Sequence, residues 1–134
     1  MGKLMKFWRI VAGNPEIKSL ILGEWLRLNY ISVGYERLHD ADRSQRQLFT
    51  NMEKGDKVVV VTDGCIWAVG EIAGKPYEKD EPPAYKNRKN VVWYKITRVR
   101  YDGLPEKLQN KLTNQPSIRR LSNDEWQTIV LHIT

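Results

Sequence analysis

Hydrophobic and polar positions along the first third of the chain predict two strands separated by a short helix. Residues 6–12 (KFWRIVA) are rich in aromatic and β-branched side chains, which is typical of a strand. Asn14 and Pro15 interrupt this run, and because asparagine caps helices and proline suits the first helical position, a helix is expected from Pro15 to about Leu22. The run Tyr30–Tyr35 (YISVGY) predicts the second strand.

The middle of the chain contains its clearest local signal, a β-hairpin. The segments Lys57–Thr62 (KVVVVT) and Cys65–Ala73 (CIWAVGEIA) flank Asp63-Gly64, a pair that tolerates the positive φ angles of a two-residue turn. Four consecutive valines predict that the first of these strands is covered on both faces. Before the hairpin, a helix is expected over Arg43–Met52. Its inward stripe would comprise Leu48, Phe49 and Met52.

The second half of the chain predicts a long polar loop followed by a long strand. Residues Lys75–Asn90 (KPYEKDEPPAYKNRKN) contain three prolines, and a loop of this length is a candidate for function. Val91–Tyr101 (VVWYKITRVRY) predicts a strand in which every second side chain points to one face. That face would comprise Val91, Trp93, Lys95, Thr97, Val99 and Tyr101.

Two helices and a short strand are expected toward the end of the chain. A helix begins at Leu104-Pro105, and Ile118–Leu121 predicts the strand. Ser122-Asn123-Asp124-Glu125 has the pattern of a capping box, which opens a last helix. The apolar stripe of that helix would comprise Trp126, Ile129, Val130 and Ile133.

The predicted elements do not alternate regularly between strand and helix, which favours an α+β fold. We expect a small, strongly bent mixed sheet or open barrel flanked by short helices. No linker composition occurs within residues 1–134, so a single domain is expected. This domain is either the whole protein or the N-terminal fragment of a larger one.

The composition excludes several classes of protein. With 41% hydrophobic and 28% charged residues among 134, the chain is typical of a globular domain that buries its own core. It contains no apolar run of about 18 residues, so no membrane partner is expected. The single cysteine, Cys65, excludes an internal disulfide framework and fits a reducing, cytoplasmic environment.

Positive charge is concentrated in one segment. Of the net charge of +6, residues 84–120 carry +8, from ten bases and two acids, and the remainder carries −2. Because lysine and arginine hold phosphates through counterion release, this segment indicates a polyanion partner, although a solvated basic surface would have the same composition. The residues expected to contact a nucleic-acid backbone are Lys86, Arg88, Lys89, Arg98 and Arg100.

The sequence shows no catalytic constellation. Cys65 lies just after the hairpin turn in a valine-rich strand pair, where we expect a small hydrophobic residue rather than a nucleophile. His39 and His132 are far apart in the sequence and have no cysteine or acidic cluster at ligand spacing. We therefore expect no enzymatic activity, no cofactor and no metal site.

The aromatic residues divide into two groups. One group follows apolar periodicities and is expected in the core: Trp8, Phe49, Trp93 and Trp126. The other group lies near loop ends: Trp25, Tyr30, Tyr35 and Trp67. Aromatic side chains beside a basic segment are what a base-stacking site needs, and rings that close the open end of a small barrel would have the same pattern.

Several sequence blocks together carry a resemblance to a known family: Phe7-Trp8-Arg9-Ile10, Trp25, Ile31–Tyr35, Met52–Val58, Ala68–Gly74, Tyr77 and Val91–Tyr94. These blocks resemble the EVE domains of the PUA-like superfamily, to which YTH domains are similar. The chain looks most like the N-terminal modules of McrB-type modification-dependent restriction proteins. The resemblance covers about Phe7 to Leu121 and implies a PUA-like, EVE- or YTH-like fold.

The resemblance also implies a site. YTH domains bind N6-methyladenine in RNA through an aromatic cage, and McrB modules read modified bases in DNA. By this similarity, Trp25 would form one wall of the pocket and Trp67 or Tyr35 the other. Ser32-Val33-Gly34 would present backbone groups to the base edge. A base within a duplex would first be flipped out, at a cost of a few kcal/mol.

The leading hypothesis is a non-catalytic reader of methylated adenine or cytosine in DNA, which serves as the targeting module of a modification-dependent restriction system. Its partners would then be modified double-stranded DNA, a GTPase motor and a nuclease subunit. One alternative is a PUA-like module that binds RNA. Another is a small hydrolase of modified nucleosides, which would need a pair such as Lys57 and Glu71, residues that equally fit a cross-strand ion pair.

Overall fold

The computed structural model describes residues 4–12, 18–33, 47–75, 77–79, 87–113 and 118–134. The strands are β1 (Phe7–Val11), β2 (Tyr30–Val33), β3 (Lys57–Thr62), β4 (Cys65–Ile72), β5 (Tyr77–Glu78), β6 (Asn87–Arg100) and β7 (Ile118–Leu121). The helices are α1 (Lys18–Leu28), α3 (Glu106–Thr113) and α4 (Asn123–Ile133), and residues 47–51 are also helical.

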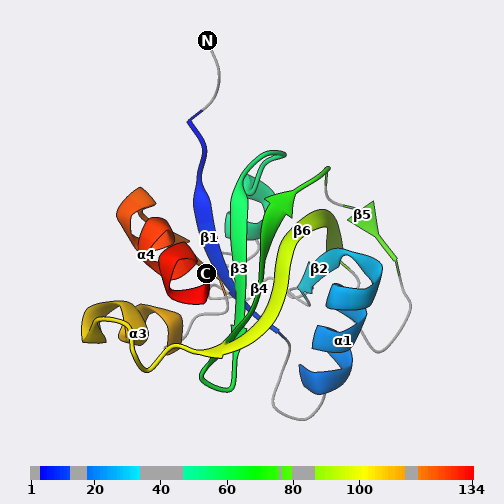
Figure 1. Cartoon of the computed structure of the whole chain (residues 1–134). Helices are drawn as coiled ribbons and strands as arrows, with labels where there is room; N and C mark the ends of the chain where they lie inside the picture. The colour runs from blue at the N-terminus through cyan, green and yellow to red at the C-terminus, as the bar shows by residue number, and fades with distance from the viewer. Residues whose placement is uncertain (1–3, 13–17, 34–46, 76, 80–86, 114–117) are drawn as a thin grey trace.

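The strands form one curled mixed sheet in the order β2-β6-β4-β3-β1-β7, and β5 pairs with β6 beside this path. β1 and β3 are parallel, and the other pairs are antiparallel. Helix α1 lies toward one side of the curled sheet, while α3 and α4 lie toward the other (Figure 1). This arrangement confirms the predicted α+β class and the strongly bent mixed sheet.

The sheet buries apolar side chains on both faces. Val58 and Val60 point to the α1 side, while Val59 and Val61 point to the α4 side, so the prediction of a strand covered on both faces is confirmed. We name the two clusters the α1 core and the α4 core. The α1 core includes Trp8, Ile10, Ile21, Leu22, Trp25, Tyr30, Ile31, Val33, Phe49, Met52, Ile72 and Val91. The α4 core includes Ile66, Val69, Tyr101, Leu104, Leu108, Leu112, Leu121, Trp126, Ile129 and Ile133.

Helix α1 is longer than the sequence predicted. It continues through Gly23 to Leu28 because Leu22 and Trp25 bury one of its faces against the sheet. The helix ends where Asn29 adopts a left-handed conformation (φ 61°) and donates its backbone N–H to the carbonyl of Trp25 at 2.9 Å. Tertiary burial therefore carries the helix through Gly23, beyond its predicted end at about Leu22.

Strand β6 differs from the prediction in both its start and its faces. It begins at Asn87, inside the segment that was expected to be a loop. The strand does not keep one face: Val91 and Trp93 pack on the α1 core, whereas Val99 and the next residue after the strand, Tyr101, belong to the α4 core. Register shifts against β4 cause this exchange of faces, so the single-face alternation that was predicted is wrong.

Several local predictions are confirmed. Asp63 (φ 54°) and Gly64 (φ 75°) form the left-handed turn of the β3–β4 hairpin. Ser122 accepts from the backbone N–H of Glu125, and the Glu125 side chain accepts from that of Ser122, which is a complete capping box at the start of α4. Cys65 is buried, as expected for a small hydrophobic residue.

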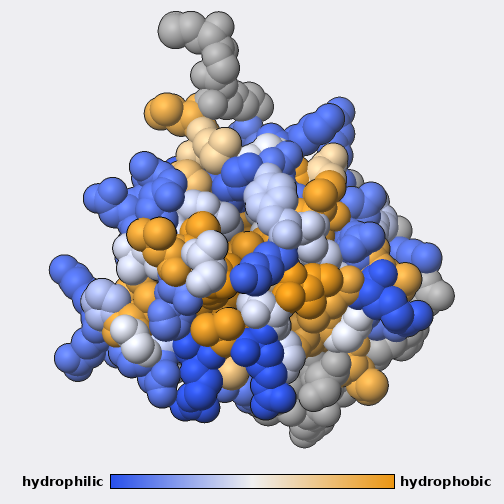
Figure 2. Space-filling model, in the orientation of Figure 1, coloured by the Kyte–Doolittle hydropathy of each residue, from blue (hydrophilic) through white to orange (hydrophobic). Residues whose placement is uncertain are grey.

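The surface combines apolar and charged areas. On the side seen in Figure 1, hydrophobic surface is exposed between hydrophilic regions (Figure 2). The exposed large hydrophobic residues of the whole described surface include Leu20, Val92, Ile96 and Leu131. No helix among the described residues is long and apolar enough to cross a membrane.

Candidate functional site

The first four residues of β6 lie between two short strands. On one side Arg88 pairs with Ser32 of β2, and on the other side it pairs with Tyr77 of β5. Directly opposed residues point to the same face of a sheet, and residues two apart on a strand also share a face. The register therefore places Tyr30, Arg88 and Tyr77 on the face of these strands that α1 covers.

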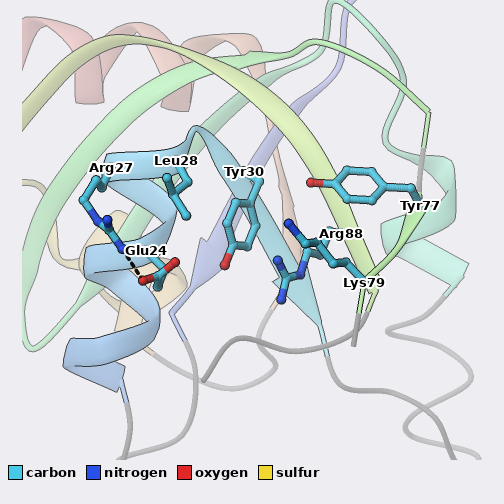
Figure 3. A pocket seen from close by; sticks show the side chains of 7 residues that line it. All are labelled: Glu24, Arg27, Leu28, Tyr30, Tyr77, Lys79 and Arg88. Atoms are coloured by element: carbon cyan, nitrogen blue, oxygen red, sulfur yellow. Dashed lines mark hydrogen bonds and ion pairs between the residues drawn. The ribbon is translucent and has the colours of Figure 1, made fainter. Parts of the chain in front are cut away.

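A pocket of about 360 Å³ opens between these strands and α1. Its lining comprises Glu24, Arg27 and Leu28 from α1, Tyr30 from β2, Tyr77 from β5, Lys79, and Arg88 from β6. Figure 3 shows the two tyrosine rings on either side of the arginine of β6, with the helix residues facing them. We name this cavity the tyrosine pocket.

The tyrosine pocket combines aromatic rings with positive charge. The guanidinium of Arg88 lies over the Tyr30 ring, 4.6 Å from its centroid, and both side chains are almost fully buried. The Tyr77 hydroxyl donates to the side-chain oxygen of Asn90 at 2.9 Å, which orients that ring. Three cations and one carboxylate line the pocket, so an anionic ligand is favoured over a cationic one.

One ion pair lies on the α1 side of the tyrosine pocket. Arg27 Nη2 lies 2.5 Å from Glu24 Oε1, one helical turn away (Figure 3). The arginine is largely exposed and the carboxylate partly buried, so the pair contributes little to stability. Its effect is to hold a guanidinium at the pocket mouth.

Trp25 lies beneath this site, in the α1 core. Its side chain is fully buried, and its indole N–H donates to the Ser32 hydroxyl at 2.8 Å. The carbonyl of Trp25 accepts from the indole N–H of Trp93 at 3.0 Å. In this structure Trp25 therefore presents no ring face to a ligand, and it supports the strand that carries Tyr30. Its assignment as a wall of the pocket is corrected accordingly.

Among the other described residues of the predicted base pocket, Trp67 lies apart from Ser32 and Val33. Ser32 and Val33 are buried in β2, and Ser32 is bound to Trp25. Trp67 lines a different cavity, on the other flank of α1. Gly34 and Tyr35 lie outside the described residues. The predicted pairing of Trp25 with Tyr35 therefore has no described counterpart in the structure.

The described residues that were predicted to contact phosphates also lie at separate places in the structure. Arg88 lines the tyrosine pocket, Arg98 lines the cavity at Trp67, and Arg100 is exposed beside Asp102. Lys89 points the opposite way from Arg88, because alternate residues of a strand face opposite sides. Lys86 lies outside the described residues.

Lys89 is fully buried, so its assignment to the phosphate-contacting set is corrected. Its ammonium donates to the carbonyl of Phe49 and to that of Met52 at 2.5 Å. Burial lowers the pKa of Lys89 to about 8, and the nearby charge of Lys6 adds to this effect, while Asp56 and Glu53 oppose it. The residue ties β6 to the end of the 47–51 helix.

The pair considered for a hydrolase belongs to a partly exposed cluster. Lys57 Nζ lies 2.7 Å from Glu71 Oε1, its opposite residue on β4, and the Tyr94 hydroxyl bonds to both. Hydrogen bonds from Lys57 and Tyr94 lower the pKa of Glu71. None of the three lines either cavity, so the cluster has the properties of a cross-strand ion pair.

Sequence reasoning missed most of the residues that line the tyrosine pocket. Tyr77 and Lys79 lie in the predicted loop, and Glu24 and Arg27 lie beyond the predicted end of the first helix. The i, i+3 spacing of Glu24 and Arg27 is a helix signal that the sequence carries. The pairing of Tyr77 with Arg88 has no such local signal, because it depends on β5 meeting β6.

The fold defined by this curled sheet and its helices is the α+β, PUA-like fold of YTH domains. The YTH domain of Zygosaccharomyces rouxii MRB1, solved in complex with N6-methyladenosine RNA, superposes with a TM-score of 0.64 at 15% identity, over 95% of this chain and 85% of that one. The Pho92 YTH domain, solved in complex with m6A, gives 0.61 at 15% identity, over 97% and 84%.

Bacterial proteins share the fold as well. Rpa0253 from Rhodopseudomonas palustris gives a TM-score of 0.58 at 13% identity, over 96% of this chain and 92% of that one. At these identities the likeness establishes the fold alone. No protein-family model and no curated protein sequence matches this chain. The PUA-like, YTH-like part of the predicted resemblance is thus supported, and the closer assignment to EVE and McrB modules is not confirmed.

Proposed function

We propose that this domain is a non-catalytic reader of a modified base in nucleic acid, and that RNA carrying N6-methyladenine is its first candidate ligand. The observation that carries the proposal is the tyrosine pocket, in which two aromatic rings and a net positive charge occur together. Support comes from the shared fold with YTH domains that were solved with N6-methyladenosine RNA in one case and with m6A in the other.

The chemistry of the tyrosine pocket suits a nucleotide. A base gains about 1–3 kcal/mol by stacking on an aromatic face. Tyr77 is half-buried and offers such a face, while the exposed Arg27 and Lys79 supply charge for a phosphate. A methyl group on the base adds about 1–3 kcal/mol when it fills an apolar notch, and Leu28 is the aliphatic residue of the lining.

The direct test is fluorescence anisotropy with four labelled ligands: single-stranded RNA with and without N6-methyladenine, and duplex DNA with and without the same base. We expect methylated RNA to bind about tenfold to a hundredfold more tightly than unmodified RNA. A preference of the same size confined to DNA would instead support the McrB-like reader, with its GTPase and nuclease partners. Equal affinity for modified and unmodified ligands would overturn the reader proposal.

A pair of variants locates the site. Tyr77→Ala removes the half-buried ring of the tyrosine pocket, and Tyr94→Ala removes an exposed tyrosine of β6 that lines neither cavity. We expect Tyr77→Ala to lower the affinity for methylated RNA by about fivefold to a hundredfold, and Tyr94→Ala to change it less than twofold. Equal effects of the two substitutions would place the binding site elsewhere.

A further inference from the structure

Two facing bulges mark a second site on the α1 side of the sheet. Between β3 and β4 the pairing passes from Val60–Ala68 to Val61–Ile66, so Trp67 is skipped. Between β4 and β6 it passes from Ala68–Ile96 to Ile66–Val99, so Trp67 and Arg98 both lie in the irregular stretch. Bulges re-aim side chains and are common next to binding sites.

The two re-aimed side chains meet. The guanidinium of Arg98 lies over the Trp67 ring, 5.3 Å from its centroid. The indole N–H of Trp67 donates to the carbonyl of Thr62 at 3.0 Å, which fixes the orientation of the ring. Trp67 is half-buried and Arg98 is exposed, so the stack lies at the surface with its geometry already set.

A cavity of about 390 Å³ adjoins this stack. Its remaining lining comprises Leu22, Gly23, Leu26, Thr62 and Asp63. A Cβ built on Gly23 would meet nothing within 4 Å, so the helix wall is open at that position. An aromatic plane with aliphatic neighbours, one guanidinium and one carboxylate is a suitable lining for a nucleobase and its phosphate.

This cavity is distinct from the tyrosine pocket. The helix residues that line it are Leu22, Gly23 and Leu26, whereas those of the tyrosine pocket are Glu24, Arg27 and Leu28. At 100° per residue these two sets lie on opposite flanks of α1, with the buried Trp25 between them. The helix therefore separates two cavities that each contain a cation stacked on an aromatic ring.

We propose that the Trp67–Arg98 cavity is a second nucleobase-binding subsite, which takes an unmodified nucleotide of the strand whose modified base occupies the tyrosine pocket. That this nucleotide belongs to the same strand as the modified base rests on the proposed function, whereas the existence of the subsite does not. The base would stack on Trp67 and its phosphate would contact Arg98, since charge and ring lie at one place.

Arg98→Ala tests this inference, and the chain offers a closely matched control. Arg120 is also exposed and also lies over a tryptophan ring at 5.3 Å, but that ring belongs to the buried Trp8 and lines neither cavity. Each substitution to alanine removes one positive charge and one cation–ring contact. With an unmodified 12-nucleotide RNA, we expect Arg98→Ala to weaken binding about tenfold and Arg120→Ala less than threefold.

Two further readouts separate stacking from charge. The indole resonance of Trp67 in the ¹⁵N-labelled protein should shift on addition of the unmodified RNA, and that of Trp8 should not. The loss caused by Arg98→Ala should become smaller at high salt, because a phosphate contact is screened, whereas the stacking that shifts the Trp67 resonance should persist. Equal losses for the two variants, or an unshifted Trp67 resonance, would overturn the subsite.

The ratio of affinities for methylated and unmodified RNA reports on the tyrosine pocket alone. We expect Arg98→Ala to leave this ratio unchanged while it lowers both affinities. A ratio of one in the unsubstituted protein, together with an intact Arg98 effect, would remove the reader proposal and keep the subsite. A preserved ratio without any effect of Arg98→Ala would overturn the subsite and leave the reader proposal standing.

Discussion

The two faces of the sheet are built from different chemistry. On the α1 side, the indole groups of Trp8, Trp25 and Trp93 each donate a hydrogen bond, to Asp56, Ser32 and the Trp25 carbonyl respectively. On the α4 side, Trp126 donates no indole hydrogen bond to any described residue and packs beside Phe7, with ring centroids 5.6 Å apart. The α4 core otherwise consists mostly of aliphatic residues.

This difference follows the positions of the cavities. Both the tyrosine pocket and the Trp67–Arg98 cavity lie on the α1 side, where residues of the α1 core form part of each lining. Hydrogen bonds are directional and hold a ring in one orientation, whereas aliphatic contacts are satisfied by many arrangements. The comparison teaches that hydrogen bonds fix the three indole groups of the α1 side, whereas packing alone holds Trp126 among the described residues of the α4 side.

The largest expected effect is that of Trp25→Ala. Truncation of a buried tryptophan costs about 3–5 kcal/mol, and here it also removes the donor to the Ser32 hydroxyl. Trp126→Ala removes the same atoms from the α4 core without breaking an indole hydrogen bond to a described residue. Urea unfolding followed by circular dichroism should show the greater loss for Trp25→Ala. A larger loss for Trp126→Ala would contradict the comparison.

The next effect concerns the two lysines of β6 that donate to helix-end carbonyls. Lys89 is buried on one side, and Lys95 donates to the Ile133 carbonyl at 2.6 Å on the other. Because the pKa of Lys89 falls from 10.5 to about 8 on folding, the unfolded chain binds more protons between these values. The free energy of unfolding should therefore rise with pH across this window, by at most roughly 3 kcal/mol.

Urea unfolding between pH 7 and 10 measures this slope. Lys89→Met should flatten it, and Lys95→Met should preserve it. A slope that persists in Lys89→Met would assign the proton release to another group.

A third comparison uses two glycines of the α1 side. A Cβ on Gly70 would lie 2.4 Å from the carbonyl oxygen of Val92 and 2.8 Å from the Trp93 ring, so the strand would have to shift. We expect Gly70→Ala to destabilise the protein by about 1–3 kcal/mol. Gly23→Ala, in open space within α1, should stabilise it by about 0.5–1 kcal/mol. Thermal unfolding measures both changes in stability. An unchanged stability of Gly70→Ala would contradict the close approach of Gly70 to Val92 and Trp93.

The smallest effect is expected for a serine on the α4 side. Ser122→Ala removes half of the capping box and should cost about 1 kcal/mol, because the exposed helix end can bond to water instead. Ser32→Ala on the α1 side leaves the buried Trp25 indole without its acceptor and should cost about 1–3 kcal/mol. Chemical denaturation of the two variants measures which one loses more stability. Equal losses would weaken the distinction between the two sides.

The elements that sequence alone predicted well have local causes. The hairpin at Asp63-Gly64 and the capping box at Ser122 depend on residues within a few positions of each other. The valine run correctly predicted a strand that is buried on both faces, because four consecutive valines leave neither face polar.

The parts that were not predicted depend on pairing between distant segments. The polar start of β6 becomes a strand because β2 and β5 pair with it on both sides. The bulges that turn Trp67 toward Arg98 arise from register, which periodicity cannot reveal. The family resemblance implied that Trp25 forms a pocket wall, whereas the continuation of α1 to Leu28 buries it.

The sheet order has a consequence for self-association. The strands at its two ends, β2 and β7, have only four residues each. A short outer strand offers few backbone groups to a second sheet, and β7 adds Arg119 and Arg120, whose like charges repel another copy of the same edge. The two outermost strands of the sheet order are therefore poor templates for pairing with another sheet.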